Sequence, residues 1–112
     1  MQKDNLIYIN HIYDCIIKIE SYTESISLEE FLKNSLIQDG VIRNFEVIGE
    51  ATKKLSADFR LKNTAIEWKK ISGMRDKLIH DYLGVDLWAL WAVITDKLPE
   101  LKKQIEEILD NE

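Results

Sequence analysis

The segment RDKLIHDY, residues 75–82, carries the side chains of this chain that are best suited to chemistry. It places Arg75, His80 and Tyr82 within one short stretch. In a helix, Asp76 and His80 lie four residues apart on one face, so their side chains can hydrogen-bond. Arg75 and Tyr82, seven residues apart, also share a face, whereas Arg75 and His80 are separated by roughly 140°. The segment could therefore be an active site or a solvated, salt-bridged helix face.

These side chains suit phosphodiester transfer without a metal ion. Neutral imidazole, with a pKa of about 6.5, can take a proton from a ribose 2′-hydroxyl near neutral pH, and the oxygen can then attack the adjacent phosphorus. The fork of Arg75 can bind the non-bridging oxygens and stabilise charge in the transition state. Asp76 could orient the ring of His80, and Tyr82 would offer a hydroxyl beside the site. A metal site of Asp76, His80 and Asp81 is a weaker alternative, because no further His or Cys cluster supports it.

Composition indicates one helical domain, residues 1–112, without a membrane span. The chain is 46% hydrophobic and has only four glycines and one proline. It has neither a signal peptide pattern nor a run of about 18 apolar residues, so a cytoplasmic protein is expected. The single Cys15 cannot form an internal disulfide and is expected in the core. The net charge of −5 argues against a protein that coats nucleic acid non-specifically, so any nucleic-acid site must rest on few residues.

Apolar residues at steps of three and four predict a helix over residues 5–20. Capping boxes, in which Ser or Thr is followed three residues later by Glu or Gln, predict helix starts at Ser27 and Ser35. The second of these helices is expected to be long and to contain Gly40 and Gly49. Glycine lowers helix stability by about 1 kcal/mol relative to alanine, so we expect the close approach of another helix to compensate.

The second half of the chain is predicted to form shorter helices. Residues 56–63 break the apolar pattern and are expected to form a loop, after which a capping box at Thr64 would begin a helix. Gly73 would bend or restart that helix, and Gly84 would end it. The remaining helix starts are predicted at Asp86 and, with a proline in the first turn, at Pro99.

No segment alternates with a period of two over the length of a strand. The expected fold is therefore all-α, an antiparallel helical bundle of about five to six helices. Arg43 could add positive charge to a site or pair with Glu46 or Glu50, which lie three and seven residues further on. Tryptophans could stack bases, although core or dimer packing is favoured for Trp68, Trp88 and Trp91. The lysine pairs are expected to form solvated surface, at 53–54 and 69–70.

The quoted segment also resembles the Arg-x4-His-x-Tyr motif of HepT-type toxins, which belong to the HEPN superfamily (higher eukaryotes and prokaryotes nucleotide-binding). The similarity continues in three blocks that occur in the family's order. They are VIRNFEVIGEATKKL at 41–55, WKKISGMRDKLIHDYLGVDLWALW at 68–91 and DKLPELKKQIEEIL at 96–109. The resemblance therefore extends over most of the chain from residue 35 onward.

The resemblance implies an all-helical, HEPN-like domain that forms a homodimer, with two copies of the motif facing one cleft. It implies a toxin of a type II/VII-like toxin–antitoxin pair and a metal-independent endoribonuclease that needs no cofactor and acts on RNA. Arg75 and His80 would be the catalytic pair, supported by Asp76. A minimal nucleotidyltransferase antitoxin would attach AMP to Tyr82, adding anionic phosphate and bulk beside the site. Two copies of Arg75 in one cleft would create a local positive potential that a monomer lacks.

A rival hypothesis follows from the acidic charge and the lack of a broad basic surface. The chain would then be a non-catalytic helical partner of a nucleotidyltransferase, and the motif would bind nucleotide or form the dimer interface. A positive cleft around paired His80 side chains would favour the nuclease. An Arg75 buried in an ion pair with Asp76 would favour the partner.

Overall fold

The computed structural model describes residues 2–81 and 84–112, and the regular elements in these residues are all helical. The all-α prediction is therefore confirmed, while Tyr82 lies outside the described residues. None of the described helices is long and apolar enough to cross a membrane. The elements in chain order are α1 (Gln2–Thr23), α2 (Leu28–Lys33), α3 (Ser35–Lys54), α4 (Ala57–Lys62), α5 (Trp68–His80), α6 (Leu87–Ala92), the π-helical turn η1 (Val93–Lys97) and α7 (Leu98–Asp110).

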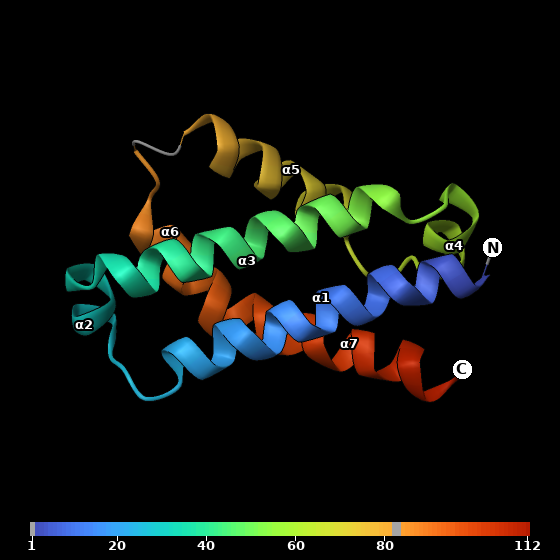
Figure 1. Ribbon diagram of the computed structural model, residues 1–112, viewed down its shortest axis with the longest axis horizontal. Coiled ribbons are helices and arrows are strands. Elements are labelled where there is room, and N and C mark those ends of the chain that lie inside the picture. Colours follow the sequence, from blue (N-terminus) through green and yellow to red (C-terminus); the bar gives the residue numbers. More distant parts are fainter. Residues whose placement is uncertain (1, 82–83) are drawn as a thin grey trace.

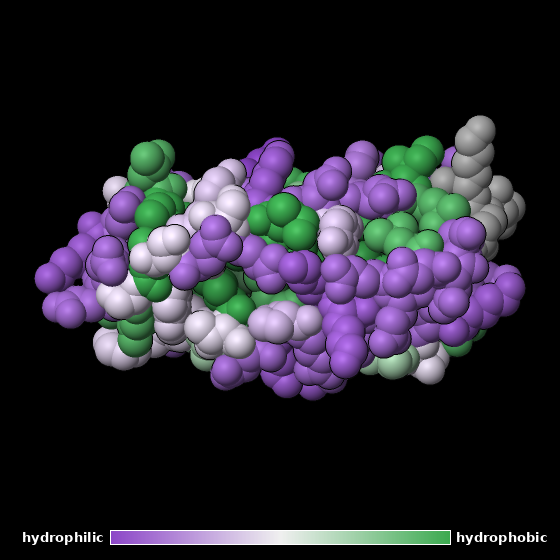
Figure 2. Space-filling view, turned by 90° about the horizontal axis from the view of Figure 1, so that it is seen from below, coloured by the Kyte–Doolittle hydropathy of each residue, from purple (hydrophilic) through white to green (hydrophobic). Residues whose placement is uncertain are grey.

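Long helices packed side by side form an elongated body of 42 × 28 × 19 Å. Figure 1 shows α1 and α3 antiparallel at its centre, with α5 packed along α3 and α7 packed along α1. The predicted antiparallel bundle is thus present. On the face seen from below in Figure 1, hydrophilic side chains dominate and hydrophobic ones appear as separate patches (Figure 2).

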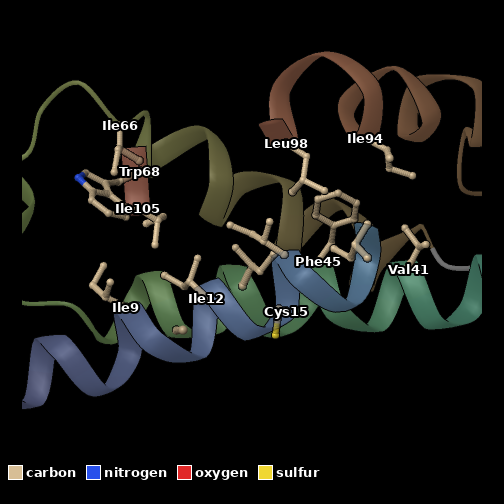
Figure 3. Packing of buried hydrophobic residues seen from close by; sticks show 14 of the residues in the cluster. Ile9, Ile12, Cys15, Val41, Phe45, Ile66, Trp68, Ile94, Leu98 and Ile105 are labelled. Atoms are coloured by element: carbon tan, nitrogen blue, oxygen red, sulfur yellow. The ribbon is translucent and has the colours of Figure 1, made fainter. Parts of the chain in front are cut away.

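The core lies between α1, α3 and α7. The apolar stripe of α1 is almost fully buried, with Ile9, Ile12 and Ile16 no more than 1% exposed. It faces α3 residues such as Phe45, and side chains of both helices point into one cluster in Figure 3. Each fully buried side chain of this size stabilises the fold by about 1.5–3 kcal/mol. Cys15 is buried in the same cluster, as predicted, and its burial raises the pKa of the thiol.

The chain from Leu87 to Asp110 forms one continuous helical rod, because α6, η1 and α7 follow each other without a break. Pro99 lies in the first turn of α7, as predicted, but the preceding helix does not end before it. Proline has no N–H, and its ring collides with the carbonyl four residues earlier in an α-helix. The π-helical turn, in which the N–H of Leu98 bonds to the carbonyl of Val93, widens the helix at this point. The rod can therefore continue through the proline.

Three predicted helix boundaries are wrong. Residues 56–63 are not a loop, because Ser56 caps the short helix α4 by accepting a hydrogen bond from the N–H of Phe59 at 3.1 Å. Phe59 alone is buried in α4, and one buried residue produces no periodic pattern in the sequence. The capping box at Thr64 does not form, since α5 begins at Trp68 and its N-cap residue makes no side-chain cap hydrogen bond. α5 also ends at His80, before Gly84.

Other caps follow the sequence more closely. The capping box at Ser27 forms, and Asp86 caps α6 by accepting from the N–H of Ala89. The cap of α3 is shifted by one residue, because Asn34 accepts from the N–H of Ile37 at 3.1 Å. Asparagine is as good an N-cap as serine, so the two neighbouring candidates compete.

Phe31 should carry much of the stability of the end of the bundle formed by α2 and α6. Its side chain is fully buried, and its ring centroid lies 5.1 Å from that of Trp91. We expect Phe31→Ala to lower the free energy of unfolding by about 3–5 kcal/mol, measured by urea denaturation. The control Leu36→Ala, at a side chain that is 81% exposed, should change it by no more than about 0.5 kcal/mol. Similar losses in the two variants would contradict this packing.

Candidate functional site

Arg75, Asp76 and His80 lie on α5, which packs against α3 (Figure 1). Trp68 and Leu78 are buried and anchor α5 to the core. Arg75 and Asp76 lie in the second half of the helix, and His80 is its last residue. α5 runs without interruption through Gly73, so the restart that was one of the two predictions for this residue does not occur. Tyr82, the fourth predicted site residue, lies outside the described part of the chain.

Gly49 is a point of very close approach between α3 and α5. A Cβ atom at Gly49 would lie 2.1 Å from the Cβ of Arg75 and 3.3 Å from the carbonyl oxygen of Ile71. The predicted close approach of another helix is therefore confirmed here. At Gly40, a Cβ would instead meet the ring of Tyr22 at 3.2 Å, a side-chain contact. Gly49 thus determines how deeply Arg75 sits against α3.

Four charged side chains form an ion cluster across these two helices: Glu50, Arg75, Asp76 and Lys53. The Nη2 of Arg75 lies 2.7 Å from Oε2 of Glu50, and its Nη1 lies 3.0 Å from Oδ1 of Asp76. The same Oδ1 accepts a hydrogen bond from Nζ of Lys53 at 2.5 Å. These contacts orient the guanidinium, and the side chain of Arg75 as a whole is 26% exposed. Partly exposed ion pairs add little to stability, but this network fixes a geometry.

The cluster keeps its charges at neutral pH. The hydrogen bond from Lys53, followed by that from Arg75, holds the pKa of Asp76 below its usual range. The hydrogen bond that Arg75 donates to Asp76 is the main cause that raises the pKa of the guanidinium, with a smaller effect of Glu50. Asp76 is therefore a carboxylate and Arg75 a cation throughout the neutral range.

His80 is exposed at the end of α5 and stands apart from the ion cluster. The carboxylate of Asp76 binds Arg75 and Lys53, and among the described residues it forms no hydrogen bond with His80. The orientation of the imidazole by Asp76, which helix spacing allows, is thus not what this structure shows. The structure brings Asp76 to Arg75 and leaves His80 facing solvent.

Other charged candidates are also resolved. Arg43 is 75% exposed and lies 3.9 Å from Glu46, a weak pair of the kind that the sequence allowed. Glu50, the other possible partner, binds Arg75 instead. Lys53 was expected on a solvated face and belongs to the ion cluster. Glu50 and Lys53 are functional candidates that sequence reasoning missed, because their approach to the motif depends on the register between α3 and α5.

The three tryptophans have different surroundings. Trp68 is buried, and its Nε1 donates to the carbonyl of Asn63 at 3.0 Å. Trp91 is partly buried and packs on Phe31. Core packing is therefore confirmed for these two, whereas Trp88 is 65% exposed. Across residues 2–81 and 84–112, no three His, Cys, Asp or Glu side chains are grouped so that they could hold a metal ion.

The family model described as "Ribonuclease HepT-like" matches residues 12–108, a span that includes the whole ion cluster and His80. The chain belongs to the HepT-like ribonuclease family. The resemblance inferred from the motif and its three sequence blocks is therefore confirmed for the family as a whole. No solved structure matches this HepT-like chain.

Curated relatives carry the same description. A protein named "Putative RNase" from Caldanaerobacter subterraneus subsp. tengcongensis is 44% identical, over 94% of this chain and 94% of the relative. One named "Probable ribonuclease HepT" from Thermococcus cleftensis is 39% identical, over 96% of this chain and 98% of the relative. A third, "Gamma-glutamylcyclotransferase and putative RNase" from Methanocaldococcus jannaschii, is 44% identical over 98% of this chain. The HepT-like chain spans only 50% of the length of that relative.

Gly49→Ala should separate α5 from α3, because the added methyl group would overlap the Cβ of Arg75. We expect the free energy of unfolding to fall by about 1–3 kcal/mol, as for other overpacked sites, in spite of the better helix propensity of alanine. The matched control is Gly73→Ala in α5, where an added Cβ meets nothing within 4 Å. It should raise the free energy of unfolding by about 0.5–1 kcal/mol. Equal shifts in urea denaturation would contradict the close approach.

Asp76 should make stability depend on pH in acid. Its pKa is lowered in the folded protein, so its charge stabilises the fold above the ordinary value of 3.8. This contribution is lost as the pH falls through the lower, folded pKa. The loss of stability in Asp76→Asn should therefore be greatest at neutral pH and shrink below pH 3.8, measured by urea denaturation across a pH series. In a Lys53→Met background, the pH-dependent part should be smaller. A difference that stays constant with pH would refute the assignment.

Proposed function

We propose that this protein is the toxin of a type II/VII-like toxin–antitoxin pair and acts as a metal-independent endoribonuclease on RNA. Arg75 binds the scissile phosphate, and His80 is the general acid or base. The observation that carries the proposal is the placement of an oriented arginine and an exposed histidine on one helix of a ribonuclease-family chain. The arginine is fixed against α3, whereas the histidine is free to meet a substrate.

The proposed reaction is internal transfer within the RNA. His80 takes the proton of a ribose 2′-hydroxyl, and the 2′-oxygen forms a bond to the adjacent phosphorus. The bond from phosphorus to the 5′-oxygen of the next nucleotide breaks, and that oxygen takes a proton from water. The imidazolium of His80 then returns its proton to the solvent. Arg75 stabilises the charge that develops on the non-bridging oxygens. The products are a 2′,3′-cyclic phosphate and a free 5′-hydroxyl.

The active unit is proposed to be a homodimer with a composite site. Arg75 and His80 of one chain are separated by about 7.5 Å along the axis of α5 and by about 140° around it. This separation makes it difficult for both side chains of one helix to reach the same phosphate. Two copies of α5 that face one cleft would bring Arg75 of one protomer and His80 of the other to the same side.

The partner is proposed to be a minimal nucleotidyltransferase antitoxin that attaches AMP to Tyr82. This residue follows His80 by two positions and Arg75 by seven. An adduct there would place an anionic phosphate and a nucleoside near the residues that bind the RNA phosphate. Inhibition would then follow from repulsion and from occupied space.

A second candidate function is a non-catalytic helical partner of a nucleotidyltransferase that binds nucleotide or another protein through the motif. One observation favours it: the fork of Arg75 is engaged by Glu50 and Asp76 of its own chain, as in a structural arginine. The partial exposure of the Arg75 side chain favours the nuclease, since the side chain is not sealed inside the protein.

The test compares RNA cleavage by the wild type, His80→Ala and His11→Ala, with EDTA present and fragment ends mapped. We expect His80→Ala to lose about 10²–10⁴-fold in rate, the usual contribution of a general acid or base. His11, an exposed residue of α1, is the matched control, and its variant should cleave like the wild type. The ends should carry 2′,3′-cyclic phosphate.

Equal cleavage by the wild type and His80→Ala would refute the assignment of the general acid or base. Cleavage that stops in EDTA would refute the metal-independent mechanism. Intact mass must be recorded on each sample, because AMP on Tyr82 would also abolish cleavage. Lack of cleavage by wild-type protein of unmodified mass would favour the non-catalytic partner.

A further inference from the structure

The guanidinium of Arg75 offers two different edges, and its own chain occupies them in different ways. Asp76 binds Nη1, and this carboxylate is itself held by Lys53 of α3. Glu50 binds Nη2 at 2.7 Å, and its only ion pair among the described residues is with Arg75. Asp76 is thus fixed by two cations, whereas Glu50 is held by one.

The edge bound by Glu50 is also the edge with an unused donor. Nε of Arg75 lies next to Nη2, is buried and has no hydrogen-bond partner in the described part of the chain. A buried donor without an acceptor costs about 1–3 kcal/mol, so this edge is incompletely satisfied by Glu50. An anion with two oxygens could bind Nη2 and Nε together, in the side-on geometry that arginine commonly forms with phosphate.

Glu50 is able to leave this edge. Its side chain is 50% exposed on α3, so the carboxylate can turn into water without burying a charge. The ion cluster contains two cations and two carboxylates, and its formal charge is therefore zero. When Glu50 turns away, the remaining Arg75, Asp76 and Lys53 carry a formal charge of +1, which is the sign required to bind a phosphate.

We propose that Glu50 and a phosphate of the RNA compete for Arg75. In the free protein, Glu50 occupies the phosphate-binding edge of the guanidinium, and it is displaced when RNA binds. This inference rests on the proposed ribonuclease function and assigns to that site a built-in competitor on α3. Glu50 therefore sets the affinity of the site for RNA. The alternative role, in which Glu50 only holds Arg75 in position, predicts the opposite effect of its removal.

The experiment measures the affinity for a short single-stranded RNA by fluorescence anisotropy at low salt, in a His80→Ala background that prevents cleavage. We expect Glu50→Gln to tighten binding about two- to fivefold, the effect of removing one competing, partly exposed ion pair. The matched control is Glu46→Gln, which makes the same charge change one turn earlier in α3, where Glu46 pairs with Arg43. It should alter affinity less than Glu50→Gln.

A second genetic background tests whether the effect of Glu50→Gln on RNA affinity requires Arg75. In an Arg75→Ala background, Glu50→Gln should no longer tighten binding, because the competed side chain is gone. Circular dichroism and urea denaturation establish that each variant is folded. Should Glu50→Gln prove unstable, Glu50→Ser provides the same comparison with the same expected direction.

Weaker binding by Glu50→Gln would overturn the proposal and make Glu50 a positioning residue for Arg75. Tightening of the same size in Glu46→Gln, or in the Arg75→Ala background, would also overturn it, since general charge would then explain the effect. These results leave the ribonuclease assignment intact. Wild-type protein of unmodified mass that neither binds nor cleaves RNA would refute the proposed function and, with it, this competition.

Discussion

The contact between α3 and α5 at Gly49 is the constraint on which the candidate site depends. The absence of a side chain at one position of α3 lets the Cβ of Arg75 occupy the space where a Cβ of residue 49 would lie. The helix-propensity cost of this glycine, about 1 kcal/mol, accompanies the close packing of Arg75 against α3. Because α5 is seated so closely, Glu50 and Lys53 reach the motif from the neighbouring helix. The chemistry of the motif therefore belongs to two helices that are distant in the sequence.

The ion cluster also shows how an acidic chain holds one arginine in a defined position near its surface. The net charge of −5 gives no general attraction for nucleic acid, and the cluster is formally neutral. Any attraction for a phosphate must then arise locally, through rearrangement of a few side chains or through a second copy of the motif. Under the proposed function, a neutral cluster of this kind would disfavour non-specific binding, because it gives no long-range electrostatic steering. Affinity for RNA would instead depend on short-range geometry at Arg75.

Sequence patterns predicted the parts of the structure that depend on local chemistry. The long helices, the capping box at Ser27 and the cap at Asp86 follow from spacing and side-chain hydrogen bonds within one segment. α4 was not predicted, because a single buried phenylalanine produces no periodic apolar pattern in the sequence. The family and the motif were also recognisable, since Arg75 and His80 are close in the sequence. The ion cluster could not be recognised from the sequence. Spacing within one helix pairs Asp76 with His80, whereas the packing of α5 on α3 pairs Asp76 with Lys53. That register is a property of two helices and is not encoded in either alone.

The π-helical turn has a further meaning for the side of the bundle formed by α7. Leu90, Ile94 and Leu98 are buried and follow one another at steps of four residues. In an ideal α-helix each such step would rotate the apolar side by about 40°, so the stripe would drift away from the core. The wider turn at Val93–Lys97 accommodates the extra rotation, and Ile105 is again fully buried. The turn thus adjusts the rotation between two stretches of different apolar period, so that the buried residues of α6 and those of α7 both lie in the core. The length of this turn, as much as its composition, decides which side of α7 meets the core.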